Sequence, residues 1–430
     1  MALTNVLPPN SLADMGVEAE LVLKAIDKKL QIESVLDDIF EDLGADVVGS
    51  TEEPQAIPDA IFLNIGGQPT GTRQVTVPFL QALSGDPTIG PFTPVGREAK
   101  QNLKYATFKY QEYSFAVAST AWGTTYNDMA VYGVFEKIQP QISLYMKEFH
   151  GQRVREALLL THDSVLTSID PSGGGITPVE EIGFNKNWFI SNTEVHLQPQ
   201  YDTVLQGFTN NIGEKLVAAA TNHATDPGAT EINLNNLRAL EYYATNVLKI
   251  DPIMVSGKKT YVVLIPSTQV NKLKGNEQGQ LGDIYTGMVR SSDDEMRYTG
   301  VLGRVGSLLL VEDQRYPTIN RSDDGTNQTI APSFVKPGDV DNRAKTPSGD
   351  ARWDIGYLLG KAAVAELEVQ PLHFETEEQN YGRDRGTGAF GESGISLVEY
   401  DLDVASVGNA TKENKGSIVL AWTIPTIVVA

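Results

Sequence analysis

The sequence predicts a mixed α+β fold with an extended β-hairpin, and three observations carry that prediction. Two aromatic-rich stretches with strand periodicity flank a segment rich in proline and glycine, between residues 61 and 120. A long amphipathic helical pattern follows them directly, up to residue 162. Strands and helices are then mixed without regular β–α–β alternation, which favours α+β over a doubly wound parallel sheet.

The hairpin is the most distinctive of these features. Residues 73–79 alternate valine and phenylalanine on one face, as a half-buried strand does, and residues 105–117 form the returning strand. In the returning strand, the alternation of apolar and polar residues shifts by one position near Gln111, which predicts a β-bulge there. The tip, residues 84–96, carries three prolines and cannot pair for long. An isolated two-stranded ribbon is marginal in water, and no support is evident nearby in the sequence. We therefore expect the hairpin to lie on another copy of the chain.

An apolar stripe at helical spacing runs from Val131 to Leu158 and predicts a long helix. Asn127 or Asp128 can cap its start, and Pro140 is expected to kink or split it. If the helix continues to His162, about 35 residues at about 1.5 Å each make it roughly 50 Å long. We expect this helix to form a spine across the subunit.

The remaining elements form an N-terminal arm and a mixed body. The arm combines an amphipathic helix at 17–43 with an extended linker at 51–59. Residues 170–230 are rich in Gly, Asn, Thr and Pro, which indicates an insertion of irregular and β structure. The body is predicted to contain helices at 234–248 and 355–365, strands at 261–265, 305–311, 366–369, 395–402 and 418–429, a polar loop at 318–350, and a glycine-rich loop at 382–394.

Composition restricts the possible functions. The net charge is −21 and the pI is about 4.7, so the chain repels a phosphate backbone and tight nucleic-acid binding is not expected. The absence of cysteine excludes disulfides, thiolate zinc sites and cysteine catalysis. The first residues do not have the pattern of a secretory signal. The apolar C-terminal stretch, about a dozen residues, is shorter than the roughly 20 that a membrane span needs, so no membrane contact is expected.

The predicted hairpin is locally basic, although the chain as a whole is acidic. Five basic residues stand against two acidic ones between Gly66 and Gln111. An arm of that sign would be guided toward the acidic face of a neighbouring subunit. Five basic residues among 46 are also compatible with an ordinary protein surface that has no docking role. The candidate inter-subunit contact residues are Arg73, Val77, Phe79, Phe92, Arg97, Lys100, Lys104 and Lys109.

No pattern of catalytic, cofactor-binding or metal-binding residues rises above background. The five histidines lack metal-ligand spacing and are expected on the surface or as satisfied core residues. Residues 356–362 have three residues between their glycines instead of the four of a phosphate loop, and alanine replaces the required hydroxyl residue. Residues 339–344 lack the third acid and the glycine of a calcium loop, although a looser cation site there or at 323–325 stays open. We therefore predict no catalytic residues, no cofactor and no metal, so the chain is not expected to be an enzyme.

Seven short stretches occur in a recognisable order: QVTVPFLQALSG at 74–85, YQEYSFAV at 110–117, QRVR at 152–155, VLIPS at 263–267, VLGRVGSLLLV at 301–311, YLLGKAA at 357–363 and EEQNYG at 377–382. No single stretch is diagnostic. The ordered set, with the sequence of arm, hairpin, spine helix and mixed body, resembles the major capsid proteins of tailed bacteriophages, which have the Hong Kong 97-type fold. Within that group, the stretches look most like the phage N4-like major capsid protein family.

The resemblance implies a division into five parts. They are an N-terminal arm at 1–60, an extended hairpin loop at 61–120, a peripheral domain with the spine helix and an insertion at 121–231, an axial domain at 232–394, and C-terminal strands at 395–430 that return to the peripheral domain.

The resemblance also implies a function. The chain would be a structural protein of the virion that self-assembles through hexamers and pentamers into an icosahedral capsid around double-stranded DNA, in the cytoplasm of the bacterial host. Its partners would be other copies of itself, portal and scaffolding proteins and a decoration protein, with only weak non-specific contact with the packaged DNA. The alternatives are another virion component, such as a decoration or tail protein, and an enzyme of unknown class, which would need a cleft with convergent polar groups.

Overall fold

The structure is a computed structural model of the whole chain. It describes residues 45–49, 59–66, 74–80, 103–119, 134–161, 167–169, 176–178, 185–190, 193–196, 232–255, 258–276, 301–323, 328–335, 352–379, 384–401 and 412–424. The predicted arm helix at 17–43, the hairpin tip at 84–96 and the expected start of the spine helix near Asn127 lie outside these residues.

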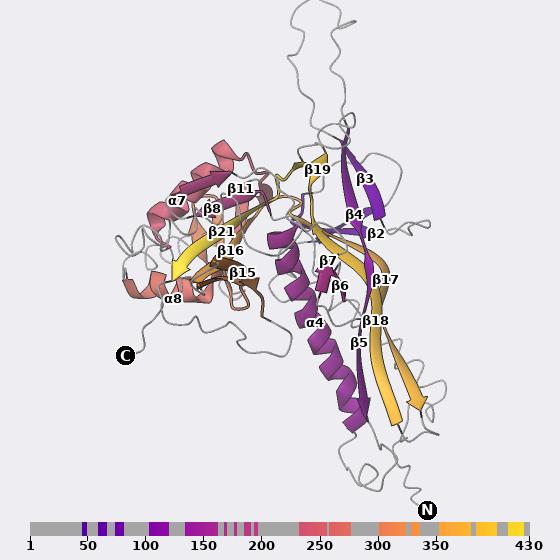
Figure 1. Cartoon of the computed structure of the whole chain (residues 1–430). Helices are drawn as coiled ribbons and strands as arrows, with labels where there is room; N and C mark the ends of the chain where they lie inside the picture. Colours follow the sequence, from indigo (N-terminus) through magenta and orange to yellow (C-terminus); the bar gives the residue numbers. More distant parts are fainter. Residues whose placement is uncertain are drawn as a thin grey trace, which may run out of the picture.

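The largest sheet forms one lobe of the molecule (Figure 1). Its main path follows the order β12 (Val301–Val305), β13 (Leu308–Asp313), β11 (Lys258–Pro266), β16 (Arg352–Leu359), β21 (Ser417–Ile424), β8 (Asn187–Ile190) and β9 (Thr193–His196). Strand β10 (Ile253–Val255) pairs with β11, and the hairpin of β14 (Thr318–Asp323) and β15 (Gln328–Ser333) pairs with β16 through β14.

Smaller sheets form the other part of the molecule. The longest has the order β1 (Ala45–Gly49), β2 (Phe62–Gly66), β17 (Val364–Gln379), β18 (Asp384–Leu397) and β5 (Gln111–Ser119). A second has the order β20 (Lys412–Glu413), β19 (Tyr400–Asp401), β4 (Leu103–Lys109) and β3 (Gln74–Leu80), and β6 (Thr167–Ile169) pairs with β7 (Ile176–Pro178). Below, "the large sheet" is the β11-containing sheet and "the long sheet" is the one built on β17 and β18.

Helices cover both faces of the large sheet because its central strands are apolar on both sides. Val262 and Leu264 of β11 pack in one cluster with the C-terminal half of helix α4 (Val134–Leu160). The alternate residues Tyr261 and Val263 pack on the opposite face, with α7 (Leu234–Tyr242), the π-helical turn η3 (Tyr243–Val247) and α8 (Ser267–Asn276). An unbroken apolar run is typical of a strand buried on both faces, so the predicted strand at 261–265 and helix at 234–248 are confirmed.

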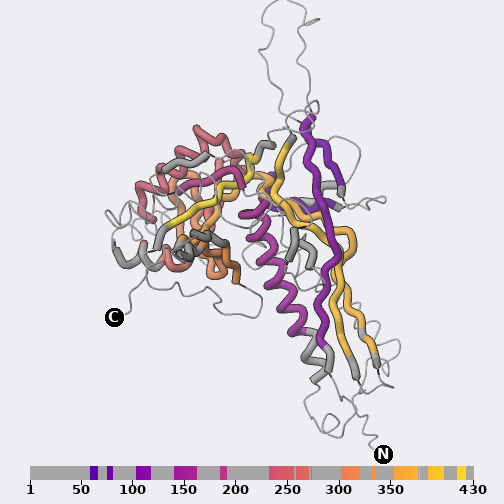
Figure 2. The backbone as a smooth tube through the Cα atoms, in the orientation of Figure 1, coloured from indigo at the N-terminus to yellow at the C-terminus, as the bar shows by residue number. Residues whose placement is uncertain are grey.

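Helix α4 runs along the long sheet and forms the predicted spine (Figures 1 and 2). It has 27 described residues, which correspond to about 40 Å. Its Ile142 and Met146 pack in an apolar cluster with Phe374 of β17 and Ala389 of β18. Pro140 lies exposed in the second turn of the helix, where it removes one intrahelical hydrogen bond but does not split the helix.

The base of the hairpin is supported within its own chain, which corrects the expectation from the sequence. Strands β3 and β4 pair in antiparallel register from Gln74–Lys109 to Leu80–Leu103, as predicted. Their apolar face, however, packs in one buried cluster with residues of β2, β17 and β19. Apart from β2, the support comes from strands nearly 300 residues away, so the sequence did not reveal it.

The phase slip near Gln111 has a different cause from the predicted bulge. The chain leaves the hairpin at Tyr110 and continues as β5, which pairs with β18 in an unbroken register from Ser119–Arg385 to Gln111–Ser393. The slip therefore marks the transfer of one chain from the small sheet to the long sheet.

Three further predictions were wrong. The region predicted as a helix at 355–365 contains β16, a turn at Lys361 and Ala362, and the start of β17. Both faces of these strands are buried, so their apolar residues do not alternate and were mistaken for a helical pattern. The predicted polar loop at 318–350 contains the β14–β15 hairpin. The predicted glycine-rich loop at 382–394 is most of β18, where small residues leave room for rings such as that of Tyr113 against Gly391.

Other expectations agree with the described residues. The predicted strand at 305–311 is present as β13, with a turn at Gly306, whose φ of 61° suits glycine, separating it from β12. The late strands at 395–402 and 418–429 correspond to the end of β18, β19 and β21.

We expect Gly394→Ala to destabilise the subunit by about 3 kcal/mol or more, because the added methyl group must displace backbone. A Cβ at Gly394 would overlap the carbonyl oxygen of Lys109, where β18 crosses the β4–β5 transfer point. The matched control is Gly386→Ala on the same strand, where the nearest atom, the Val117 carbonyl oxygen, lies 3.8 Å from the added Cβ. Urea denaturation should show a change within about 0.5 kcal/mol for the control. Equal stabilities of the two variants would contradict the close crossing.

Candidate functional site

The candidate contact residues from the sequence fall into three groups. Val77 and Phe79 are 1% and 0% exposed and belong to the core of their own subunit, where Phe79 packs edge-on against Tyr400. Lys104 is buried, with its ammonium nitrogen 5.4 Å from the centre of the Tyr400 ring, and Lys109 is half-buried at the end of β4. The others, Arg73, Phe92, Arg97 and Lys100, lie outside the described residues. A role of these residues at subunit contacts stays a prediction.

Buried polar groups of α4 connect the two main sheets. His150, Arg153 and Arg155 lie among apolar residues in the last three turns of the helix, and all three are buried. Two residues correspond to about 200° of rotation around a helix, so Arg153 and Arg155 point to opposite sides. Arg153 reaches the long sheet, and Arg155 reaches the large sheet.

Arg155 forms a two-pronged ion pair with Asp313 of β13. Its Nε and Nη2 donate to Oδ2 and Oδ1 at 3.0 and 2.9 Å, and its Nη1 donates to the carbonyl of Gly151 at 2.9 Å. The hydroxyl of Tyr357 on β16 donates to the carbonyl of Arg155 at 2.9 Å. Burial raises the pKa of Tyr357 well above its ordinary value, so the phenol keeps the proton that it donates.

Arg153 binds the long sheet in a different way. Its Nη1 donates to Oγ of Ser393 at 2.9 Å, and its Nη2 donates to the Ser393 carbonyl at 3.0 Å. The guanidinium also lies over the Tyr113 ring of β5, 4.6 Å from its centre, and 5.8 Å from the centre of the Phe149 ring. One side chain thus holds β18 and β5 against the helix through hydrogen bonds and a cation–π contact.

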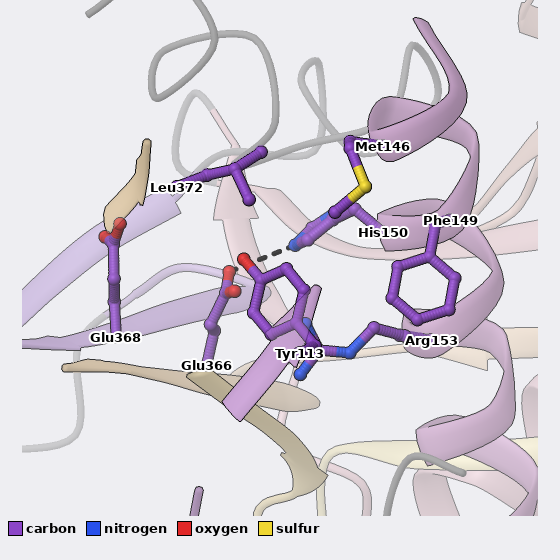
Figure 3. A pocket seen from close by; sticks show the side chains of 8 residues that line it. All are labelled: Tyr113, Met146, Phe149, His150, Arg153, Glu366, Glu368 and Leu372. Atoms are coloured by element: carbon purple, nitrogen blue, oxygen red, sulfur yellow. Dashed lines mark hydrogen bonds and ion pairs between the residues drawn. The ribbon is translucent and has the colours of Figure 1, made fainter. Parts of the chain in front are cut away.

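His150 completes the polar cluster, one turn before Arg153 (Figure 3). Its Nε2 lies 3.0 Å from Oε2 of Glu366 on β17. The two residues line a small cavity together with Tyr113, Met146, Phe149, Arg153, Glu368 and Leu372. The register of β17 against β18 shifts between Glu368 and His373, so the strand is irregular at the edge of the cavity.

The two glutamates of β17 have pKa values displaced in opposite directions. Burial alone would raise the pKa of the Glu366 carboxyl, but the charge and hydrogen bond of His150, with Arg153 and Ser393, outweigh burial and hold it below its ordinary value. For Glu368, burial and then the negative charge of Glu366 raise the pKa above its ordinary value. The cluster therefore favours the ionised form of Glu366 and disfavours the ionised form of Glu368.

The geometry fits a structural connection better than a reaction centre. The cavity has room for about one water molecule, which is too little for an organic substrate. Within the described residues, no group of three or more His, Asp or Glu side chains is arranged to hold a metal ion. No helix in the same part of the chain is both long and apolar enough to cross a membrane.

Sequence reasoning missed Arg153, Arg155 and Asp313 as key residues. The available signal was weak: two arginines and a histidine interrupt an apolar helical stripe at positions that should face the core. Buried arginine nearly always has a charged or polar partner, but the sequence could not identify Ser393 and Asp313 as those partners.

Solved phage capsids have a similar fold. The match to the capsid of Ralstonia phage GP4 covers 90% of this chain and 91% of the phage capsid chain, with a TM-score of 0.52 and 12% sequence identity. The acid-stable capsid of Helicobacter pylori bacteriophage KHP30 matches 86% of this chain and 90% of its own, with a TM-score of 0.53 and 15% identity. The match to the head structure of Helicobacter pylori bacteriophage KHP40 covers 89% of this chain and 95% of the phage chain, with a TM-score of 0.50 and 15% sequence identity. This chain has the fold of a phage capsid. No protein-family model and no curated protein matches the sequence.

We expect Arg155→Met to lower the free energy of unfolding by about 3–5 kcal/mol, because it leaves the Asp313 carboxylate buried without its counter-charge. Adding Asp313→Asn should recover part of this loss, since it removes the unpaired charge and keeps an acceptor for the Arg315 N–H. The control is Arg315→Met, which breaks an ion pair with Glu148 whose side chains are about a quarter exposed and should cost at most about 1 kcal/mol. Similar losses for Arg155→Met and Arg315→Met would show that burial of the first pair is not decisive.

The low pKa of Glu366 predicts a loss of stability in acid. A carboxyl with a lowered folded-state pKa contributes stability above the ordinary value of about 4.3, and this contribution is lost as pH falls through the folded-state pKa. Glu366→Gln should therefore cost about 1.5–3 kcal/mol at pH 7, and the difference from wild type should shrink toward pH 3. Denaturant titrations from pH 3 to 7 measure it.

Glu368→Gln is the matched control, because the effect of its charge has the opposite sign. Its raised pKa means that the ionised form costs stability as pH rises through that pKa. The variant should be as stable as wild type near pH 4 and more stable at pH 7. A stability loss at pH 7 for both glutamine variants would refute the opposing roles.

Proposed function

We propose that this chain is the major capsid protein of a tailed bacteriophage and that it self-assembles into a closed shell around the packaged DNA. One observation carries the proposal: the fold agrees with solved phage capsids over about nine-tenths of both chains, so it includes the long helix, the long sheet and the large sheet together. A decoration or tail protein would not need this whole arrangement.

The shape of the subunit supports the proposal. The α4 spine and the strands β5, β17 and β18 form a long, narrow part, and the large sheet with α7 and α8 forms a lobe to one side (Figures 1 and 2). A subunit of this shape offers several separate faces to its neighbours. Contacts between different faces of identical subunits generate rings when the rotation closes, which is how we expect hexamers and pentamers to form.

The finer organisation is also proposed. We infer a Hong Kong 97-type arrangement with a peripheral part around α4 and an axial part in the lobe of the large sheet, and a place within the N4-like branch on the strength of the seven sequence stretches. Pairing of β17 and β18 with β5, together with their packing on α4, supports moving residues 364–394 from the axial to the peripheral domain.

Partners follow from the same proposal. We propose assembly in the host cytoplasm with portal and scaffolding proteins, and a decoration protein on the finished capsid. The net charge of −21 supports weak contact with DNA, because an acidic inner wall does not bind the phosphates that it encloses.

The deciding experiment is negative-stain electron microscopy of the purified chain, with sedimentation velocity on the same sample, alone and after co-expression with a scaffolding protein. Closed shells, or rings of five and six subunits, are the expected result. A monodisperse monomer under all of these conditions would overturn the proposal.

Deleting residues 84–96 should leave folded subunits that do not close into shells. The base of the hairpin, β3 and β4, stays intact and packed in its own core, so circular dichroism and thermal unfolding should match wild type. A variant with a Gly-Ser segment of the same length separates the effect of length from that of sequence. Intact particles from the deletion variant would refute a role for the tip in assembly.

A further inference from the structure

In the part of the chain that the structure describes, the outer side of α7 and η3 presents exposed apolar surface. Leu237, Leu240 and Tyr243 face inward to the core of the large sheet. On the outer side, Tyr242 is 61% exposed and Val247 is 46% exposed. Figure 1 shows α7 at the outer margin of the lobe, on the side away from α4. Tyrosine and arginine are enriched among the residues that contribute most to protein interfaces.

An irregular backbone shapes this surface. The last turn of the helix is a π-helix, from Tyr243 to Val247, so residues 245–247 are exposed in succession and Val247 points outward. Lys249 follows with a φ of 53°, a left-handed conformation that costs a lysine roughly 1–2 kcal/mol. Single π-turns and strained residues of this kind are frequent at functional sites.

Among the described residues of α7, η3 and the turn up to residue 250, the exposed charged side chains are both basic. Arg238 and Lys249 are exposed, and along the chain they precede and follow Tyr242. Glu241 belongs to the same helix, but its carboxylate accepts hydrogen bonds from the N–H and the hydroxyl of Ser307, at 2.8 and 2.7 Å, in the turn between β12 and β13. The acid is thereby withdrawn from the outer side. Asp251 comes only after the chain has turned toward β16, where its carbonyl accepts the Lys361 N–H.

We propose that Arg238, Tyr242, Val247 and Lys249, together called the α7 face, form a docking surface for the acidic surface of a second copy of this chain. The proposal rests on the proposed function, which requires contacts between copies. Charge complementarity selects the occupant, because a chain with 55 acidic and 34 basic side chains presents mainly carboxylates to a basic face.

Exposed carboxylates of the required kind lie far from the α7 face in the same molecule. Glu112 on β5 and Glu375 and Glu377 on β17 are exposed on the long sheet, on the other side of the spine from the α7 lobe (Figure 1). A basic face and acidic surfaces on different parts of one subunit meet only between copies. Such a contact joins unlike faces and can repeat around a ring.

Two variants of the full-length chain test the proposal. Tyr242→Ser removes the aromatic contact, and the double variant Arg238→Glu with Lys249→Glu reverses the charge. All three residues are exposed, so the thermal unfolding of the subunits should stay close to that of wild type. We expect both variants to lower the yield of rings or shells by roughly tenfold or more at equal protein concentration, by electron microscopy and sedimentation velocity. The defect of the charge-reversal variant should diminish as salt rises, because salt screens exposed charges.

The matched control is Lys258→Glu with Lys259→Glu, a double charge reversal at two exposed positions at the start of β11, outside the α7 face. It should assemble like wild type. If the α7-face variants assemble as well as wild type, the docking proposal is overturned while the capsid function stands. An equal defect in the control also overturns it, because the effect would then follow from net charge alone. If wild type itself stays monomeric, both proposals fall.

Discussion

The arrangement of the subunit depends on two arginines that leave one helix in opposite directions. Arg153 binds Ser393 in the long sheet, and Arg155 binds Asp313 in the large sheet, so both sheets are fixed to the same two turns of α4. Apolar packing holds the helix to each sheet but has little directional preference. The forked, charge-assisted hydrogen bonds define which atoms meet. Buried ion pairs contribute little net stability, so their value here is that any other placement of α4 leaves a charge buried without a partner.

A second polar junction lies where the chain passes from the large sheet to the long sheet. The turn between β16 and β17 donates four backbone hydrogen bonds to distant segments. Those from Gly360 to Gly416, from Lys361 to Asp251 and from Ala362 to Ala60 are 2.7 Å long, and the one from Ala363 to Ile61 is 2.9 Å long. Beside it, the side chains of Asn185, Asn414 and Ser417 bind one another at 3.0–3.1 Å. Segments from the beginning, middle and end of the chain therefore meet at one point. Because so many fixed bonds converge there, the orientation of the two sheets is set by backbone geometry as well as by the arginines.

These connections suit the proposed function of a shell protein. The subunit is long, and its outer surfaces are strongly acidic in sum, so identical copies repel one another wherever basic residues do not intervene. Basic residues of the predicted hairpin and of the α7 face would direct which surfaces approach. Many modest contacts, repeated around rings and between them, can stabilise a shell although each one alone is weak. A rigid spine would keep the spacing between those contacts constant, which closure of a shell requires.

Local patterns in the sequence determined several features. The amphipathic stripe of α4, the apolar strand at 261–265 and the alternating hairpin strands each have a period that a single segment reveals. The α+β class and the resemblance to phage capsid proteins followed from the order of such segments. In contrast, the regions taken for a helix at 355–365 and a loop at 382–394 became strands. Their residues do not alternate because both faces of the sheet are covered, or because glycines make room for rings from another strand.

Only the tertiary structure decided which distant residues meet. The partners of Arg153 and Arg155 lie 240 and 158 residues away along the chain, and nothing local distinguishes Ser393 or Asp313 from other polar residues. The support of the hairpin and the inward turn of Glu241 were equally undetectable, since both depend on long-range pairing of strands. Periodicity records which side of a segment is buried. Which residues cover that side is decided only in the folded chain, because packing energy depends on contacts between residues that are far apart in the sequence.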